Sequence, residues 1–109
     1  MTNKAKNTST NEEMVLLMEQ ADLCQSLTHP FRLKILKILG EGRKNVSEIM
    51  EVTNKPQPFI SQHLRVLREK KVVLTARDGN EVFYSLSDPK IVKICELVAE
   101  LINQRTPRE

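Results

Sequence analysis

Residues 55–71 constrain the fold more than any other stretch, because they predict one helix with two chemically different faces. Ile60, Leu64 and Leu67 recur at helical spacing and form an apolar stripe suited to a core. The other side carries side chains that hydrogen-bond base edges or phosphates, namely Gln57, Ser61, Gln62, Arg65 and Arg68. We therefore expect a helix that starts near residues 56–57 and lies in a groove of DNA.

The residues just before this stretch predict a partner helix. Asn45 is followed three residues later by Glu48, which is the spacing of a capping box at a helix start. Ile49 and Val52 are expected to face the core, and the helix is expected to end at residues 53–54. A short turn then leads into a helix over residues 57–70. Two helices joined by a tight turn, the second with base-reading side chains, form a helix-turn-helix.

After Lys71 the hydrophobic pattern changes from a helical period to a period of two. Residues 72–77 and 81–86 are rich in β-prone side chains, and Asp78-Gly79-Asn80 between them is a strong hairpin signal. Arg77 and Asn80 flank the tip of this hairpin, within reach of a phosphate or a minor groove. The pattern predicts a β-hairpin wing beside the helix-turn-helix.

Three further helices are predicted around this unit. The first begins near Thr10, the second begins at Pro30 and stops at Gly40, and the last follows Ser87-Asp88-Pro89. The predicted fold is mainly α with a β-hairpin wing (α+β), a winged helix-turn-helix with the order helix, helix, helix, helix, strand, strand, helix. Residues 11–103 are expected to form this domain, between a disordered arm (1–10) and a disordered tail (104–109).

The first and last helices carry more apolar side chains than a core of this size can bury. Their stripes include Met14, Leu17 and Met18 near one end of the chain, and Val98 and Leu101 near the other. We expect a homodimer built on these terminal helices. Such a dimer would place two copies of the residue 57–70 helix one DNA turn apart, facing successive half-sites of an inverted repeat.

Charge is concentrated on the same part of the chain. The formal net charge is only +3, but residues 55–77 carry six basic side chains against the single acid Glu69, a local charge of +5. A localised basic patch is expected of a nucleic-acid binder, although a solvated basic face that binds nothing remains an alternative. The sequence shows no signal peptide and no membrane span, so we expect a cytoplasmic protein with reduced cysteines.

Four blocks of the sequence resemble the ArsR/SmtB family of prokaryotic metalloregulatory repressors: residues 27–36, 46–49, 57–68 and 77–86. The resemblance implies a dimeric winged-helix repressor that binds a palindromic operator and dissociates when an inducer binds or a thiol reacts. It places Gln57, Ser61, Gln62 and His63 on the recognition helix, and Arg77 and Asn80 on the wing. The chain departs from the family pattern at Pro56, Phe59 and Lys71, where a capping Ser or Thr, a smaller residue and Gly are common.

The part that senses an inducer is less clear than the part that binds DNA. Neither of two common metal sites of the family is present, because residues 46–52 contain no Cys or His and the last helix contains no His. We therefore expect no metal at those two sites and no cofactor. Cys24 and Cys95 lie on the two predicted dimerisation helices, so a reversible disulfide or a thiophilic site is one hypothesis. The alternative is that both are small apolar packing residues.

The leading hypothesis is a sequence-specific DNA-binding repressor with double-stranded DNA and a second copy of itself as partners. A winged-helix protein-interaction module that does not read DNA is the alternative, and no enzyme is expected because no nucleophile and base are paired. The candidate DNA-binding residues are Gln57, Ser61, Gln62, His63, Arg65, Arg68, Lys70, Lys71, Arg77 and Asn80.

Overall fold

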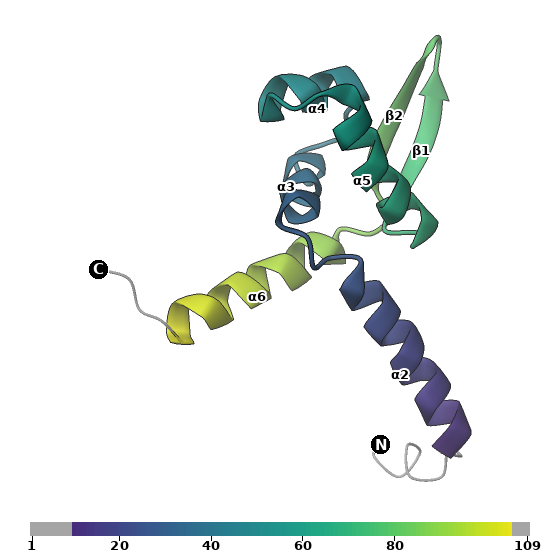
Figure 1. The fold of residues 1–109 in the computed structure, drawn as a ribbon, viewed down its shortest axis with the longest axis vertical. Helices are drawn as coiled ribbons and strands as arrows, with labels where there is room; N and C mark the ends of the chain where they lie inside the picture. The colour runs from purple at the N-terminus through teal and green to yellow at the C-terminus, as the bar shows by residue number, and fades with distance from the viewer. Residues whose placement is uncertain (1–9, 106–109) are drawn as a thin grey trace.

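The computed structural model describes residues 10–105 of the 109-residue chain. Along the chain these residues form α2 (Thr10–Gln25), α3 (Pro30–Leu39), α4 (Val46–Thr53), α5 (Gln57–Glu69), β1 (Val73–Asp78), β2 (Glu81–Leu86) and α6 (Lys90–Arg105) (Figure 1). This order confirms the predicted winged helix-turn-helix. The expected tails lie mostly outside the described residues, but Thr10 and residues 104–105 belong to α2 and α6, so both helices extend slightly past the predicted domain limits.

Side chains before α3 and α4 fix where these helices begin. The Nδ1 atom of His29 accepts a hydrogen bond from the N–H of Phe31 at 3.0 Å, which caps α3. The predicted capping box of α4 is present: Asn45 Oδ1 accepts from the Glu48 N–H at 2.8 Å, and Glu48 Oε1 accepts from the Asn45 N–H at 2.9 Å. Helix α5 starts behind Pro56, which supplies no side-chain cap. The departure at Pro56 therefore leaves that helix end without the usual oxygen acceptor.

The core lies between α3, α4, α5 and the start of β1. It contains the three residues predicted for the buried side of α5, within the set Ile35, Leu36, Ile38, Leu39, Ile49, Ile60, Leu64, Leu67, Val72 and Val73. The prediction for Val52 is wrong, because its side chain is 57% exposed. Val46, Met50 and Thr53 are half-buried, so the buried side of α4 is centred on the side of Ile49 away from Val52.

Lys71 makes a tight exit from α5, at the position where the family that the sequence resembles commonly has glycine. The N–H groups of Lys71 and Val72 donate to the carbonyls of Arg68 and Leu67, each at 2.9 Å. This is the Schellman arrangement, in which the residue at the Lys71 position adopts left-handed backbone, and Lys71 has φ = 61°. A side chain in this conformation costs about 1–2 kcal/mol relative to glycine, so the helix end stores strain.

Replacing Lys71 by glycine is expected to raise the free energy of unfolding by about 0.5–1 kcal/mol. The gain comes from removing the Cβ strain, and it is reduced because glycine loses more backbone entropy on folding. Urea denaturation of the parent and of Lys71→Gly measures the difference. Lys71→Ala is the control, since it removes the same charge but keeps the Cβ. Equal stability of the glycine and alanine variants would contradict the assignment of strain to this position.

The hairpin is attached to the helix-turn-helix by the segment between α3 and α4. Strands β1 and β2 are antiparallel, with Val73 opposite Leu86 and Asp78 opposite Glu81. A two-residue turn connects them and has positive φ at Gly79, which glycine adopts without steric cost. Lys44 and Tyr84 exchange backbone hydrogen bonds at 3.0 and 2.8 Å, so β2 is bridged on its second edge as well. The wing is thereby held beside the entry to α4.

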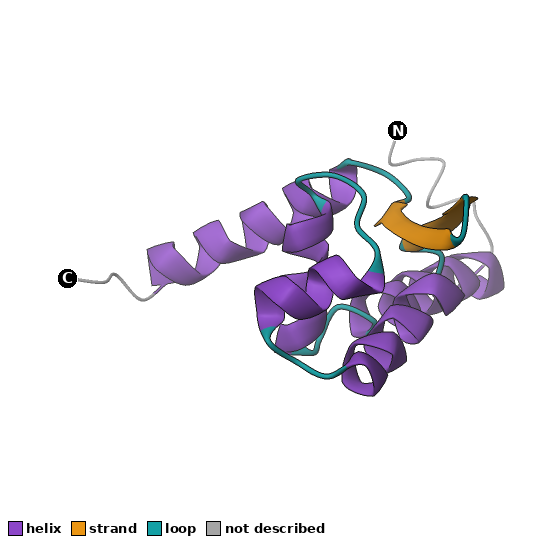
Figure 2. Ribbon diagram, turned by 90° about the horizontal axis from the view of Figure 1, so that it is seen from above, coloured by secondary structure: helices purple, strands orange, loops and turns teal. Residues whose placement is uncertain are grey.

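Helices α2 and α6 diverge from the compact part of the fold (Figures 1 and 2). Gly40 lets α6 approach the end of α3, since a Cβ there would come within 2.8 Å of Val92 Cγ2. Beyond this contact much apolar surface is open. The exposed large side chains on the two helices are Met14, Val15, Leu16, Leu17, Met18, Leu23, Ile94, Leu97, Val98, Leu101 and Ile102. Among the described residues no helix has the length and hydropathy needed to span a membrane.

Candidate nucleic-acid interface

The outer face of α5 is polar, basic and open to solvent. Gln57, Gln62, Arg65 and Arg68 are exposed, and Ser61 is half-buried between them. Two contacts within the helix organise this face: Gln57 Nε2 donates to Ser61 Oγ at 2.7 Å, and Arg65 Nε pairs with Glu69 Oε2 at 3.2 Å. Both contacts link residues four apart on the helix surface, where they are easily exchanged for contacts with a ligand.

His63 lies on the buried side of α5 and not on its exposed face. Its side chain is 8% exposed. Its ring packs at a tilt against His29 and Phe31, with centroids 4.4 and 5.4 Å apart, and edge-to-face against Phe59 at 4.9 Å. The structure therefore favours the packing role for His63 over a contact with phosphate. Phe59 also turns inward, with its ring 4.7 Å from that of Phe31. The bulky residue at this family departure fills the space behind the helix.

The His63 ring is in an environment that disfavours its charged form. Burial lowers the pKa of His63, and electrostatic interaction with the nearby His29 and Arg32 side chains lowers it further. Its Nδ1 atom and the Nε atom of Arg32 are both buried without a hydrogen-bond partner among the described residues. A proton on His63 would therefore add an uncompensated charge to this cluster.

Acidification is expected to destabilise the protein through His63. Above the ordinary histidine pKa of about 6.5 both folded and unfolded chains hold His63 neutral; below it the unfolded chain takes up a proton that the folded chain resists. Stability is thus lost as the pH falls from about 6.5 toward the lowered folded pKa. Chemical denaturation at pH 7.5 and 5.5 measures this loss, which should be smaller in a His63→Phe variant. An equal loss in parent and variant would assign the pH dependence to other groups.

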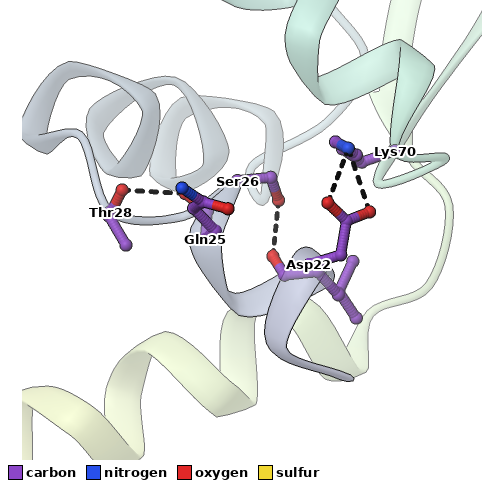
Figure 3. Close-up of polar contacts among 6 residues, drawn as sticks. Asp22, Gln25, Ser26, Thr28 and Lys70 are labelled. Atoms are coloured by element: carbon purple, nitrogen blue, oxygen red, sulfur yellow. Dashed lines mark hydrogen bonds and ion pairs between the residues drawn. The ribbon is translucent and has the colours of Figure 1, made fainter. Parts of the chain in front are cut away.

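The basic residues after α5 differ in their availability. Lys71 is exposed, whereas the ammonium group of Lys70 lies 2.8 and 2.9 Å from the two carboxylate oxygens of Asp22 on α2 (Figure 3). Lys70 is therefore occupied by a partner within the chain. The sequence pattern contained no signal for this contact, because the two residues are far apart along the chain.

The wing presents Arg77 and Asn80 at an exposed tip, as predicted. Arg43, which the sequence patterns did not indicate, supports this tip from the segment before α4. Its guanidinium group pairs with Asp78 at 2.9 Å and lies 4.0 Å from the centre of the Phe83 ring. Asn45 Nδ2 donates to Glu81 Oε1 at 2.6 Å on the same side. These contacts orient the two acids that flank the turn and partly offset charge that would repel a phosphate.

The two cysteines lie in different environments. Cys24 is exposed on α2, whereas Cys95 on α6 is half-buried and packs against the core. Burial raises the pKa of the Cys95 thiol, and the neighbouring carboxylate of Glu96 raises it further, so Cys95 is held in its less reactive protonated form. Within residues 10–105 no group of three or more His, Cys, Asp or Glu side chains gathers in a way that could hold a metal ion.

These features define a class of protein. A tight turn of residues 54–56 joins α4 to α5, α5 exposes amide, hydroxyl and guanidinium groups, and a two-stranded wing with an arginine near its tip stands beside it. This is the winged helix-turn-helix of DNA-binding transcriptional regulators.

Comparison with known proteins identifies the family. The family model described as bacterial regulatory protein, arsR family, matches residues 29–73. The transcriptional repressor PagR of Bacillus anthracis is 37% identical over 87 residues, which is 79% of this chain and 87% of PagR. The chain belongs to the ArsR family of bacterial regulatory proteins. It is a DNA-binding transcriptional regulator, and this supports the leading hypothesis over the interaction module.

Solved structures agree with this assignment. The crystal structure of PagR superposes with a TM-score of 0.69 at 35% sequence identity, covering 78% of this chain and 98% of that one. The homodimeric winged helix-turn-helix DNA-binding domain of a possible ArsR-family regulator from Mycobacterium bovis has a TM-score of 0.79 at 22% identity, with 93% of both chains covered. At 22% identity, the match to the Mycobacterium bovis domain shows that the two proteins share a fold.

Proposed function

We propose that this chain is a homodimeric repressor that binds an inverted-repeat operator in the cytoplasm and leaves it in response to an inducer. The observation that carries the proposal is the exposed face of α5, where base-reading and phosphate-binding side chains occur together beside a supported wing. Relatives that are similar over most of their length are named as repressors, among them PagR and the biofilm growth-associated repressor of Xylella fastidiosa. The named relatives are regulators, so we propose no catalytic role.

Within this proposal the residues divide by chemistry. Gln57, Ser61 and Gln62 read base edges in the major groove, because amide and hydroxyl groups donate to and accept from them. The guanidinium and ammonium groups hold the phosphates, and their positions along α5 and the wing set the register on the duplex. The proposed phosphate and wing contacts are Arg65, Arg68, Lys71, Arg77 and Asn80, with Lys70 available only after release from Asp22.

The proposed dimer is built on α2 and α6. In the described part of the chain α2 buries none of its residues, and the outer half of α6 exposes Leu97, Val98 and Leu101. Apolar patches of this extent mark an interaction surface. In a dimer with a two-fold axis, this surface of one copy would pack against the same surface of the other. A winged helix-turn-helix domain of the same fold is homodimeric, which supports a dimer of this chain.

Selection of bound duplexes from a random pool, followed by footprinting, tests the proposed function. The enriched duplex is expected to contain two inverted half-sites whose centres lie about one helical turn, roughly 34–36 Å, apart. Size measurement of the free protein should give a dimer. Failure to enrich any sequence, together with salt-insensitive retention on a DNA column, would instead support a winged-helix module that does not read DNA.

We propose Cys24 and Cys95 as the first residues to test for inducer sensing. Exposed Cys24 is accessible to oxidant or a thiophilic ion, whereas protonated Cys95 is the slower partner. Diamide is expected to reduce operator binding several-fold in the parent and to leave a Cys24→Ser, Cys95→Ser variant unaffected in a band-shift assay. An unchanged response in the double variant would assign both thiols to packing.

A further inference from the structure

Helix α2 is joined to the rest of the described chain mainly through its C-terminal end. None of its residues is buried, whereas Ser26 immediately after it is 3% exposed and Leu27 packs on the core. Ser26 Oγ donates to the carbonyl of Leu23 at 2.6 Å, and Thr28 Oγ1 donates to that of Gln25 at 2.8 Å, which closes the turn out of the helix (Figure 3). The direction of α2 is therefore decided within its last turn and the residues that follow.

The ion pair between Asp22 and Lys70 lies at this same end of α2. It joins that helix to Lys70, the C-cap residue of α5. One ammonium group contacts both carboxylate oxygens, at 2.8 and 2.9 Å. Lys70 also lies next to the strained Lys71 exit, where the backbone of α5 is fixed by the Schellman hydrogen bonds. The pair thus connects the proposed dimerisation helix to a rigid point on the proposed recognition helix.

We propose that the Asp22–Lys70 pair sets the angle between α2 and α5, and thereby the spacing of operator half-sites that the dimer accepts. This inference rests on the proposed DNA-binding dimer. It makes Asp22 a positioning residue that acts through Lys70 without touching DNA. The Asp22 and Lys70 side chains are 54% and 35% exposed, so the pair adds little to overall stability, and its effect is on geometry.

The length of α2 makes a small change of angle important. Its 16 residues span about 24 Å at a rise of about 1.5 Å per residue. A tilt of roughly 10° at its attached end moves the far end by about 4 Å, which exceeds the rise of about 3.4 Å per base pair. Both protomers would tilt. Losing the pair is therefore expected to widen the range of distances between the two recognition helices by more than the rise of one base pair.

The test uses the dimer of this chain and the duplex selected from the random pool, with one or two base pairs inserted or removed between the half-sites. The parent is expected to lose at least tenfold in affinity for each altered spacing. Asp22→Asn and Lys70→Gln should bind the original duplex more weakly and discriminate between spacings at most threefold. The charge-exchanged variant, Asp22→Lys with Lys70→Asp, should recover most of the discrimination between spacings. If the single substitutions only damaged the fold, this exchange would not restore the discrimination.

A second measurement does not depend on DNA. Spin labels on Gln62→Cys, in a Cys24→Ser, Cys95→Ala background, report the distance between the two α5 helices of the free dimer. A narrow distribution of distances that broadens on Asp22→Asn is the expected result.

An unchanged distribution and an unchanged spacing preference would overturn the inference. A uniform gain in affinity for every duplex would also overturn it, by showing that Asp22 only competes with phosphate for Lys70. A monomeric parent would instead refute the proposed function itself.

Discussion

Alanine at both Arg65 and Arg68 is expected to weaken binding to every duplex and to flatten its dependence on salt. Both guanidinium groups are exposed on the outer face of α5, and Arg65 forms a surface pair with Glu69. Removing one phosphate contact lowers the slope of log K against log salt by about 0.9, so the four arginines of a dimer would account for about 3–4 units. Band-shift titrations between 50 and 200 mM salt, taken as approximate limits, measure it.

Two controls distinguish phosphate binding from other effects. Lys37→Ala removes an exposed positive charge from α3, outside the helix-turn-helix and the wing, and should leave the slope nearly unchanged. Gln62→Ala should keep the salt slope but relax the preference at one base pair by about 1–3 kcal/mol. If the arginine and glutamine variants behaved alike, the division of α5 into base-reading and phosphate-binding residues would be wrong.

Leu67→Ala is expected to lower the free energy of unfolding by about 2–5 kcal/mol. Leu67 is fully buried, with 0% exposure, and it supplies the carbonyl that accepts the Val72 N–H at the end of α5. Truncation leaves a cavity between α5 and the start of β1, and a small domain has only about 5–15 kcal/mol of stability in total. Urea denaturation followed by circular dichroism gives the difference.

Leu74→Ala is the matched control for this variant. Leu74 is the same residue type on the neighbouring strand, but its side chain is 51% exposed. Its replacement should change stability by no more than about 0.5 kcal/mol. A similar loss in both variants would mean that the hairpin, and not the α5 core, limits stability.

Local patterns were sufficient for the order and type of the elements. The period of Ile60, Leu64 and Leu67 predicted which side of α5 is buried, because a regular helix repeats its environment every three to four residues. Asn45 and Gly79 predicted a helix start and a turn through chemistry that acts within a few residues. Val52 shows the limit of such patterns, since the rotation of a short helix about its axis depends on what packs against it.

The amino-acid sequence was enough to predict the winged helix-turn-helix and the exposed polar face of α5, since both depend on residues close together in the chain. The family resemblance, and not local spacing, marked Lys71 as unusual. Tertiary packing was needed to establish which candidates lie free on the surface. It buried His63 among aromatic rings, paired Lys70 with Asp22 and brought Arg43 to Asp78. The residues in these contacts are 34 to 48 positions apart in the chain: His29 and His63, Arg43 and Asp78, and Asp22 and Lys70. Such contacts form when helices and strands pack together, so residue spacing along the chain does not predict them.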